Sequence, residues 1–221
     1  MDKNLQGIEC LQQGKIEEAL KLFTERIEEA PHEPTAYINF GHVLSTVGEL
    51  ERAEKFYQKA IEVDPEAGAA YYALGTFLYE QNHLEEACKQ FEQAIHKGLE
   101  ESDAFFMLGM TLMQLDQAVF ALPYLQRAVE LNEEDVEGRF QFGLALAKAN
   151  ALDEAIAQFE RVIDADPEHA DAYYNLGVAY AGHLEDTNRA MVMFNKALAV
   201  QPDHMLAGYG KKMIEKAAEQ S

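Results

Sequence analysis

The chain has 221 residues, of which 48% are hydrophobic, and its 39 acidic against 18 basic side chains give a formal net charge of −21. Its length and hydrophobic content suffice for a buried core, and the dominance of Ala, Leu, Glu, Gln and Lys predicts helices. The charge excludes nucleic acids and anionic membrane surfaces as partners, because binding either of them needs clustered Lys and Arg. It leaves two interpretations open, an acidic surface that aids solubility and a preference for basic partners.

The beginning of the chain reads MDKNLQGIECLQQGK and contains no apolar core of a secretory signal. No later stretch approaches the ~18–20 apolar residues that a membrane helix needs. Cys10 and Cys88 are far apart and form no CxxC or metal-ligand pattern, so we expect both to be buried, reduced thiols. These features predict a cytoplasmic protein without a metal or another cofactor.

Glycines recur every 34 residues along most of the chain, at Gly7, Gly41, Gly75, Gly109, Gly143 and Gly177. Alanines follow twelve residues behind them, at Ala19, Ala53, Ala87, Ala121, Ala155 and, one residue late, Ala190. An aromatic residue or leucine stands four residues after each alanine, and prolines close four of the six units. The pattern predicts six repeats, over residues 1–33, 34–67, 68–101, 102–135, 136–169 and 170–204.

Each repeat contains two amphipathic helix patterns, which the second repeat illustrates. Residues 37–44 place their apolar side chains on one helical face, Gly48 and Glu49 break that helix, and residues 50–61 form a second apolar stripe that ends at Asp64-Pro65. Where two such helices cross closely, we expect the glycine of the first to face the alanine of the second. Both ladders are therefore interpreted as packing positions and not as functional ones.

Several residues depart from the pattern. The first repeat carries Lys3, Gln6 and Cys10 where others are apolar, which is typical of a cap that faces water. Pro123 is expected to delay or kink the second helix of the fourth repeat, and Arg139 replaces an aromatic residue in the fifth. The sixth repeat has one extra residue between its helices. After it, residues 205–219 predict a final helix that covers the last repeat with a stripe of Met205, Leu206, Tyr209, Met213 and Ala217.

The repeat resembles the tetratricopeptide repeat (TPR) family. The segments YYALGTFLY…EEACKQFEQA, YYNLGVAY…RAMVMFNKA and YINFGHVL…RAEKFYQKAIEVDP carry the resemblance, which extends over residues 2–203. It implies an all-α, right-handed α-solenoid of antiparallel helix pairs, formed as one domain over residues 1–221. The first helix of each pair would line a concave surface.

The resemblance also implies where a partner binds, because TPR ligands contact the second, fifth, ninth, twelfth and thirteenth positions of the repeat. The fifth position gives Ile38, Tyr72, Phe106, Phe140 and Tyr174, and the ninth gives His42, Thr76, Met110, Leu144 and Val178. The twelfth position adds Tyr79 and Met113, and an asparagine often meets a peptide backbone one place after the fifth, where Asn39 and Asn175 stand. We expect these side chains to form an apolar strip that does not pack helix against helix within a repeat. The alternative is that curvature buries part of the strip between neighbouring first helices.

Acidic residues at the second position, Asp103, Glu137 and Asp171, would rim this strip and favour a partner that carries Lys or Arg. No repeat has a basic residue at its fifth position and none has one at its second. The lysine and arginine clamp by which some TPR adaptors hold acidic chaperone tails is therefore not expected.

The leading hypothesis is an adaptor or scaffold that binds a peptide or an amphipathic helix of another protein. The alternative is a structural protein whose strip is filled by another copy, so the chain is expected to be a monomer or a weak homo-oligomer. An enzyme is not expected. His42 and Ser45 share a helix face, but the sequence places no carboxylate beside them, and GYGKK at 208–212 lacks the preceding strand and the length of a phosphate-binding loop.

Overall fold

The computed structural model describes residues 2–219, and the chain divides into two compact units, Met1–Leu115 and Asp116–Ser221. Every element assigned within the described residues is an α-helix, and none of these helices is long and apolar enough to cross a membrane. The boundary between the units falls within the fourth predicted repeat, so its first helix belongs to unit 1 and its second helix to unit 2.

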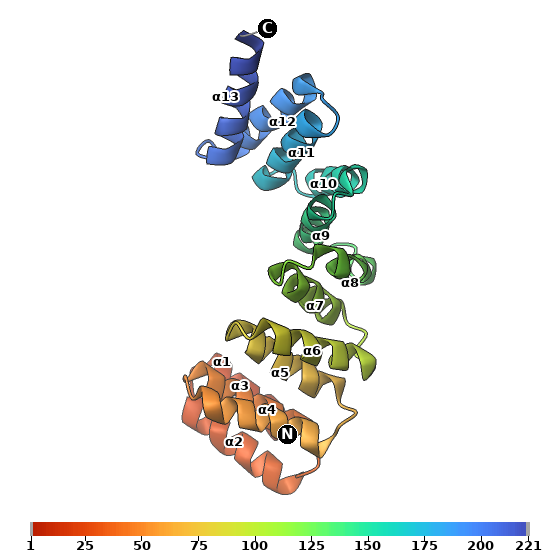
Figure 1. Ribbon diagram of the computed structural model, residues 1–221. Helices are drawn as coiled ribbons and strands as arrows, with labels where there is room; N and C mark the ends of the chain where they lie inside the picture. Colours follow the sequence, from red (N-terminus) through yellow and green to blue (C-terminus); the bar gives the residue numbers. More distant parts are fainter. Residues whose placement is uncertain (1, 220–221) are drawn as a thin grey trace. The chain divides into compact units, whose positions relative to one another are not determined.

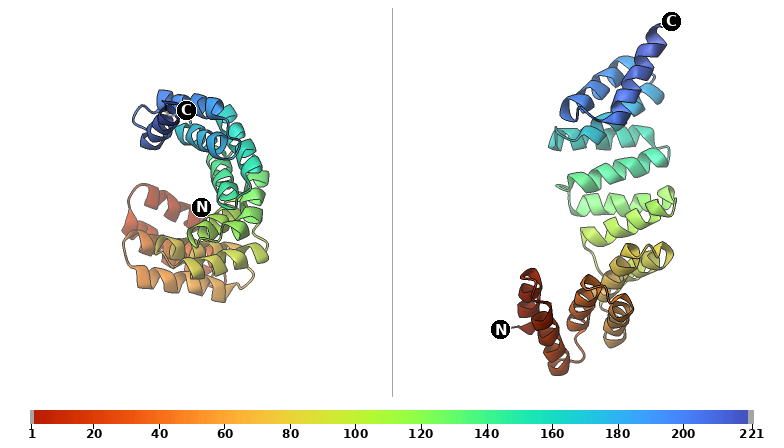
Figure 2. Two further views of the ribbon diagram at one scale, coloured as in Figure 1. Left: turned by 45° about the horizontal axis from the view of Figure 1, so that its top comes forward. Right: turned by 90° about the vertical axis from the view of Figure 1, so that its left-hand side faces the viewer.

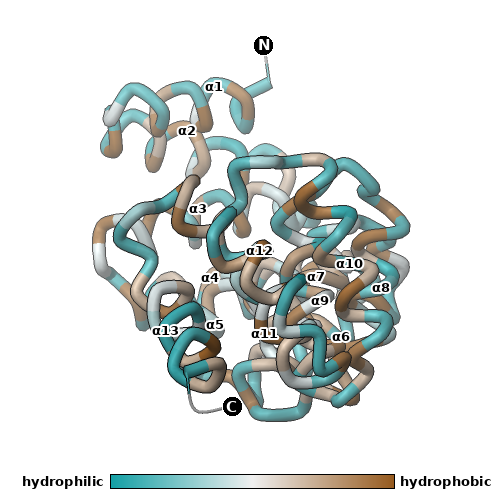
Figure 3. Tube along the Cα trace, turned by 90° about the horizontal axis from the view of Figure 1, so that it is seen from above, coloured by the Kyte–Doolittle hydropathy of each residue, from teal (hydrophilic) through white to brown (hydrophobic). Residues whose placement is uncertain are grey.

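Unit 1 contains three complete helix pairs and one further helix (Figure 1). Its helices are α1 (Lys3–Gln12), α2 (Ile16–Glu29), α3 (Pro34–Thr46), α4 (Leu50–Val63), α5 (Gly68–Glu80), α6 (Leu84–His96) and α7 (Ser102–Gln114). Each helix contacts the next one along the chain, and the first helices α1, α3, α5 and α7 also contact one another in that order. In Figure 3 the tube of α1 and α2 alternates between hydrophobic and hydrophilic residues, as expected of helices that bury one face.

Unit 2 has the same construction. Its helices are α8 (Ala118–Leu131), α9 (Val136–Lys148), α10 (Leu152–Ala165), α11 (Ala170–Gly182), α12 (Thr187–Val200) and α13 (Met205–Glu219). The pairs α9–α10 and α11–α12 correspond to the fifth and sixth repeats, and α13 lies against α11 and α12 (Figure 2).

A residue with a positive φ angle ends the first helix in every repeat. Such residues recur every 34 positions, with φ between +60° and +82°, at Gly14, Gly48, Asn82, Asp116 and Asn150. In the sixth repeat the turn has one extra residue, as predicted, and Glu185 takes this conformation at φ +53°. Glycine, asparagine and aspartate tolerate the left-handed region best, so the ladder explains where the first helices stop.

Five of the six ladder glycines face an aromatic ring and not the alanine ladder, which corrects the prediction from the sequence. A Cβ atom added to the glycine would lie 2.4 Å from Phe23 at Gly7 and 2.9 Å from Tyr57 at Gly41. The same contact recurs at 2.8 Å between Gly75 and Phe91, 2.7 Å between Gly143 and Phe159, and 2.5 Å between Gly177 and Phe194. The rings are almost completely buried, so the glycine supplies the space in which each ring lies.

The proline in the second helix of the fourth repeat does not delay that helix. α8 begins at Ala118 and continues through Pro123 to Leu131. Pro123 lacks the N–H that would bond to the carbonyl of Val119, and both residues are exposed, so water can take the place of the lost bond. The expectation of a delayed helix was therefore wrong.

The final helix covers the last repeat with a different face from the predicted one. The predicted stripe is exposed, by 85% at Met205, 56% at Leu206, 66% at Tyr209 and 51% at Met213. Ala207 is fully buried instead, and a Cβ atom at Gly210 would lie 2.7 Å from the ring of Phe194. Small residues allow the close approach of α13 to α12, and large side chains would prevent it.

Two further predictions concern polar residues. Cys10 and Cys88 are free, as expected, but both are only half-buried, and burial raises the pKa of the Cys88 thiol to about 11. Lys3 of the predicted N-terminal cap forms ion pairs of 2.7 Å with both Glu25 and Glu29 of α2. The polar residue thus finds its partners within its own repeat.

Candidate functional site

The residues predicted to bind a partner lie on the first helices of the repeats. We call the second, fifth, ninth and twelfth positions of these helices, together with the asparagines after the fifth, the first-helix face. In unit 1, contacts between α3 and α5 and between α5 and α7 bring the faces of consecutive repeats next to one another. The short turns between paired helices place the second helices on the other side.

The fifth-position side chains do pack within their own repeats, contrary to the prediction. The ring centroid of Tyr72 lies 5.7 Å from that of Phe91, Phe140 lies 5.7 Å from Phe159, and Tyr174 lies 6.1 Å from Phe194. The cause is the glycine three residues further along, because its contact with the same ring brings that ring beneath the fifth position.

Burial separates the fifth-position residues into two groups. Ile38 and Phe140 are buried, with exposed fractions of 9% and 7%, and are therefore core residues that a partner cannot contact directly. Tyr72, Phe106 and Tyr174 are half-buried and keep an accessible edge. The alternative interpretation, that part of the strip is core, thus holds for two of the five residues.

The ninth and twelfth positions are more accessible. His42 and Val178 are exposed, and half-buried side chains occupy the remaining predicted positions, at Thr76, Tyr79, Met110, Met113 and Leu144. Gln114 of α7 donates a hydrogen bond from its Nε2 to the hydroxyl of Tyr79 on α5, which ties these two helices together. The neighbouring helices α5 and α7 therefore both carry partly accessible aromatic or methionine side chains.

The two predicted asparagines differ in their hydrogen bonding. Asn175 donates from its Nδ2 to the carbonyl oxygen of Asp171 at 2.8 Å, so its amide is bound to its own helix. The Nδ2 of Asn39 is buried and has no hydrogen-bond partner among the described residues. A buried amide without a hydrogen-bond partner costs stability, so the amide of Asn39 destabilises the fold whereas that of Asn175 does not.

A polar cavity of about 260 Å³ opens on the first-helix face between α3 and α5. His42 and Ser45 line it, as does Glu80, which the sequence did not bring to attention because it belongs to the next repeat. The Nδ1 atom of His42 lies 3.0 Å from the hydroxyl of Tyr57. Desolvation lowers the pKa of His42 and raises that of Tyr57, which favours the neutral form of both groups. Since Nδ1 faces a phenol and not a carboxylate, the arrangement differs from a catalytic triad.

Two of the acidic rim residues lie near the histidines that end their own repeats. The Nε2 atom of buried His204 lies 3.0 Å from Asp171, and that of His169 lies 4.0 Å from Glu137. The Nδ1 atoms of both histidines accept hydrogen bonds of 3.2 Å from the first turns of α13 and α11. His204 therefore carries its proton on Nε2 and donates a hydrogen bond to the Asp171 carboxylate, whereas the 4.0 Å between His169 and Glu137 is too long for one. Asp103, like Glu137 and Asp171, is exposed.

Sequence reasoning missed these histidines, although they stand at equivalent positions, each immediately before a first helix. They also contact the fifth-position ring of their own repeat, with centroid distances of 4.4 Å between Phe140 and His169 and 5.3 Å between Tyr174 and His204. His204 thus orders both a carboxylate and an aromatic residue of the first-helix face in unit 2, and His169 orders the aromatic residue.

Three family models match the sequence. The middle TPR-like domain of cilia and flagella-associated protein 70 matches residues 7–117, a TPR repeat model matches residues 143–183, and a tetratricopeptide repeat model matches residues 170–204. None of the curated proteins compared with the chain matches it.

Solved structures are similar over most of the chain. YrrB, described as a TPR protein with an unusual peptide-binding site, is 52% identical over 86% of this chain and 97% of its own, with a TM-score of 0.81. MamA is 25% identical over 76% of this chain and 92% of its own, with a TM-score of 0.71. PilF of Pseudomonas aeruginosa, at 23% identity, shares the fold over 96% of both chains with a TM-score of 0.76. These matches and the helix pairs confirm the predicted fold class, an all-α solenoid of antiparallel helix pairs.

Proposed function

Because the chain belongs to the tetratricopeptide repeat family, we propose that it is a protein-interaction scaffold whose first-helix face in unit 1 binds a peptide or an amphipathic helix of a partner. The observation that carries the proposal is the set of half-buried Tyr72, Tyr79, Phe106, Met110 and Met113 on α5 and α7. Such side chains have edges that a partner can cover, and large aromatic or adaptable methionine surfaces are suited to that role.

The similarity to YrrB supports the same class of ligand, because the description of that protein names a peptide-binding site. The charge of −21 and the exposed Asp103 beside the apolar surface favour a partner with Lys or Arg next to its apolar residues. We propose binding alone as the function and assign no reaction to the cavity beside His42.

The proposal can be tested with peptides selected from a random display library on the purified protein. We expect the double substitution Tyr79→Ala with Met113→Ala to weaken the selected peptides at least ~30-fold, since alanine at contact hot spots costs about 2 kcal/mol. The matched control is Lys89→Ala with Gln93→Ala, which alters two exposed positions of α6 on the opposite side of the same unit. Equal affinities of the two double variants, both folded by circular dichroism, would refute the proposal.

A second candidate function is self-assembly, which the exposed apolar residues of α13 favour. Met205, Leu206, Tyr209 and Met213 form a large uncovered apolar surface beside Lys212 and Lys216. Lysines next to apolar residues complement an acidic, apolar surface such as the first-helix face of another copy. If this alternative holds, the mass in solution will rise with concentration, and Tyr209→Ser with Met213→Ser will return it to that of a monomer.

A further inference from the structure

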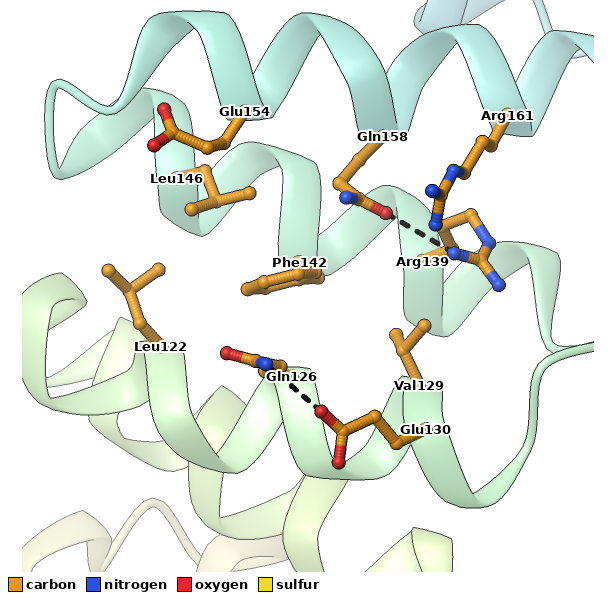
Figure 4. A pocket seen from close by; sticks show the side chains of 10 residues that line it. All are labelled: Leu122, Gln126, Val129, Glu130, Arg139, Phe142, Leu146, Glu154, Gln158 and Arg161. Atoms are coloured by element: carbon orange, nitrogen blue, oxygen red, sulfur yellow. Dashed lines mark hydrogen bonds between the residues drawn. The ribbon is translucent and has the colours of Figure 1, made fainter.

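A cavity of about 440 Å³ lies in unit 2, among side chains of α8, α9 and α10 and outside the first-helix face (Figure 4). Its apolar floor consists of Phe142 and Leu146 of α9 and Val129 of α8, which are at most 9% exposed. Arg139 and Arg161 stand at one end of the cavity in Figure 4, and Glu154 stands at the other. Glu130 also lines the arginine end, where its carboxylate is bound by Gln126 at 2.9 Å and by Arg127 at 3.4 Å. The volume is in the range of sites that hold small molecules or a few residues of a peptide.

The repeat register explains why this cavity is open. In the second repeat, Phe56 of α4 stacks on Phe40 at 4.3 Å and lies 6.4 Å from Tyr37, so rings fill the corresponding space. In the fifth repeat the positions of Tyr37 and Phe56 are taken by Arg139 and Gln158, whose polar ends hydrogen bond at 3.2 Å. The two aromatic rings are thus replaced by side chains that do not fill the space between them.

The same register brings two positive charges together. The residue at the fourth position of a repeat lies near the residue at the twenty-sixth, and in the first and sixth repeats these two residues attract one another. Lys3 forms an ion pair with Glu25 in the first repeat, and Lys196 lies 5.3 Å from the centre of the Tyr173 ring in the sixth. In the fifth repeat both positions are arginine, at Arg139 and Arg161. Two like charges repel one another unless an anion lies between them.

Neither arginine is neutralised by a carboxylate of unit 2. Arg139 donates to the side-chain oxygen of Gln158 and, at 3.0 Å, to the backbone carbonyl of Glu133. Among the described residues, Arg161 forms no hydrogen bond and no ion pair. The other four arginines each form an ion pair with a carboxylate, so the two guanidinium groups at this end of the cavity differ from the rest; the paired ones are Arg26, Arg52, Arg127 and Arg189. Guanidinium groups bind carboxylates in planar, two-pronged geometry, so the missing group is a carboxylate.

Glu154, at the opposite end of the cavity, calls for a basic group on the ligand. It lies seven residues before Arg161 on α10, which corresponds to about 10 Å along the helix axis at 1.5 Å per residue. An extended peptide covers that distance in about three residues. Since the floor between the two ends is apolar, the complementary ligand has an acidic group, an apolar middle and a basic group, in that order.

We propose that this cavity is a second binding site, which holds a short acidic–apolar–basic peptide segment of a partner protein. The side-chain carboxylate of the segment lies against Arg139 and Arg161, its apolar side chain covers Phe142 and Leu146, and its basic group faces Glu154. The site does not involve the first-helix face, so its existence is independent of the proposed function above.

The test uses four-residue peptides with acetylated and amidated ends, Glu-Leu-Leu-Lys and Gln-Leu-Leu-Lys, titrated into the full chain at up to millimolar concentration and followed by NMR. The blocked ends restrict the charge to the side chains. We expect the Glu peptide to bind about tenfold more tightly than the Gln peptide, a difference of about 1.4 kcal/mol, because only its carboxylate can accept charge-assisted hydrogen bonds from the two arginines. We expect Arg161→Gln to abolish that preference, and Lys212→Gln, which removes one exposed positive charge of α13 away from the cavity, to retain it.

Four results would overturn the proposal. The first is equal binding, or no binding, of the two peptides to the wild-type chain. The second is a preference for the Glu peptide that survives Arg161→Gln. The third is a concentration-dependent mass that Arg161→Gln abolishes, which would assign the cavity to a second copy of the chain. Loss of binding in the Tyr79→Ala, Met113→Ala variant would also count against the site, since that variant tests the first-helix face and leaves α8–α10 unchanged.

Discussion

The contact between Gly75 and Phe91 offers a direct test of how paired helices approach one another. In Gly75→Ala the new Cβ atom would lie 2.8 Å from Cε1 and 2.9 Å from Cδ1 of the Phe91 ring. Carbon atoms normally approach to about 3.5–4.0 Å, so the ring must move by roughly 0.7–1 Å. Phe91 is fully buried and in contact with Tyr72, so its displacement disturbs the first-helix face as well.

The expected cost can be separated from the effect of alanine on the helix. Overpacking of a core costs about 1–3 kcal/mol, whereas replacing a glycine inside a helix by alanine gains about 0.5–1 kcal/mol. Gly208→Ala is the matched control, because its added Cβ would meet only one atom, Cδ2 of Leu198 at 4.0 Å. We therefore expect Gly208→Ala to raise the free energy of unfolding and Gly75→Ala to lower it, by about 1 kcal/mol or more.

Urea unfolding followed by circular dichroism measures both changes, and thermal melts should show a fall of about 4–8 °C per kcal/mol for a unit of this size. Adding Phe91→Leu to Gly75→Ala should recover part of the loss, because the smaller side chain leaves room for the Cβ atom. If Gly75→Ala stabilises the chain as much as Gly208→Ala does, the glycine–ring contact is not the feature that sets the distance between the helices.

Burial lowers the pKa of His42, so the unfolded chain binds the proton more readily than the folded one. The free energy of unfolding should therefore fall as the pH drops below the unfolded pKa of about 6.5. His42→Gln should reduce that fall in urea titrations between pH 7 and pH 5. Glu185→Gly should raise the free energy of unfolding by about 0.5–1 kcal/mol, because φ is +53° there; an unchanged or lower value would contradict the strain. Tyr209→Gln should leave stability within about 0.5 kcal/mol while Ala207→Leu lowers it by about 1–3 kcal/mol; the reverse order would show that the predicted stripe of α13 does face the last repeat.

The repeats and their helices could be predicted from the sequence because each depends on local patterns. The ladder of glycines at a spacing of 34 residues and the prolines that close four repeats locate the helix pairs, and the late Ala190 correctly indicates a longer turn in the sixth repeat. Such features act through backbone conformation and helix periodicity, which a single sequence reveals directly.

The rotation of each helix about its own axis could not be predicted in the same way. Alanine and aromatic ladders both follow the glycines at a fixed spacing, and the sequence alone does not say which of them lies opposite Gly41 or Gly143. For the same reason the fifth-position residues were expected on the surface, whereas Phe140 contacts its own second helix. In α13, counting large apolar residues indicated the wrong face, because the close approach to α12 depends on Ala207 and Gly210.

The two neighbouring arginines of the fifth repeat, Arg139 and Arg161, show another limit of prediction from the sequence. The replacement of an aromatic residue by Arg139 is visible in the sequence, but its meaning depends on the residue that meets it. Only the structure shows that Arg161 lines the same cavity and that neither arginine has a carboxylate partner within unit 2.

The central claim is that the first-helix face of unit 1 binds the partner, and methionine methyl groups can report on it directly. Met110 and Met113 lie on that face, whereas Met205 and Met213 lie on α13. Titration of a library-selected peptide into protein labelled at its methionine methyl groups should shift the signals of Met110 and Met113 and leave those of Met205 and Met213 in place. Shifts confined to the methyl groups of α13, with Met110 and Met113 unchanged at saturation, would contradict the account.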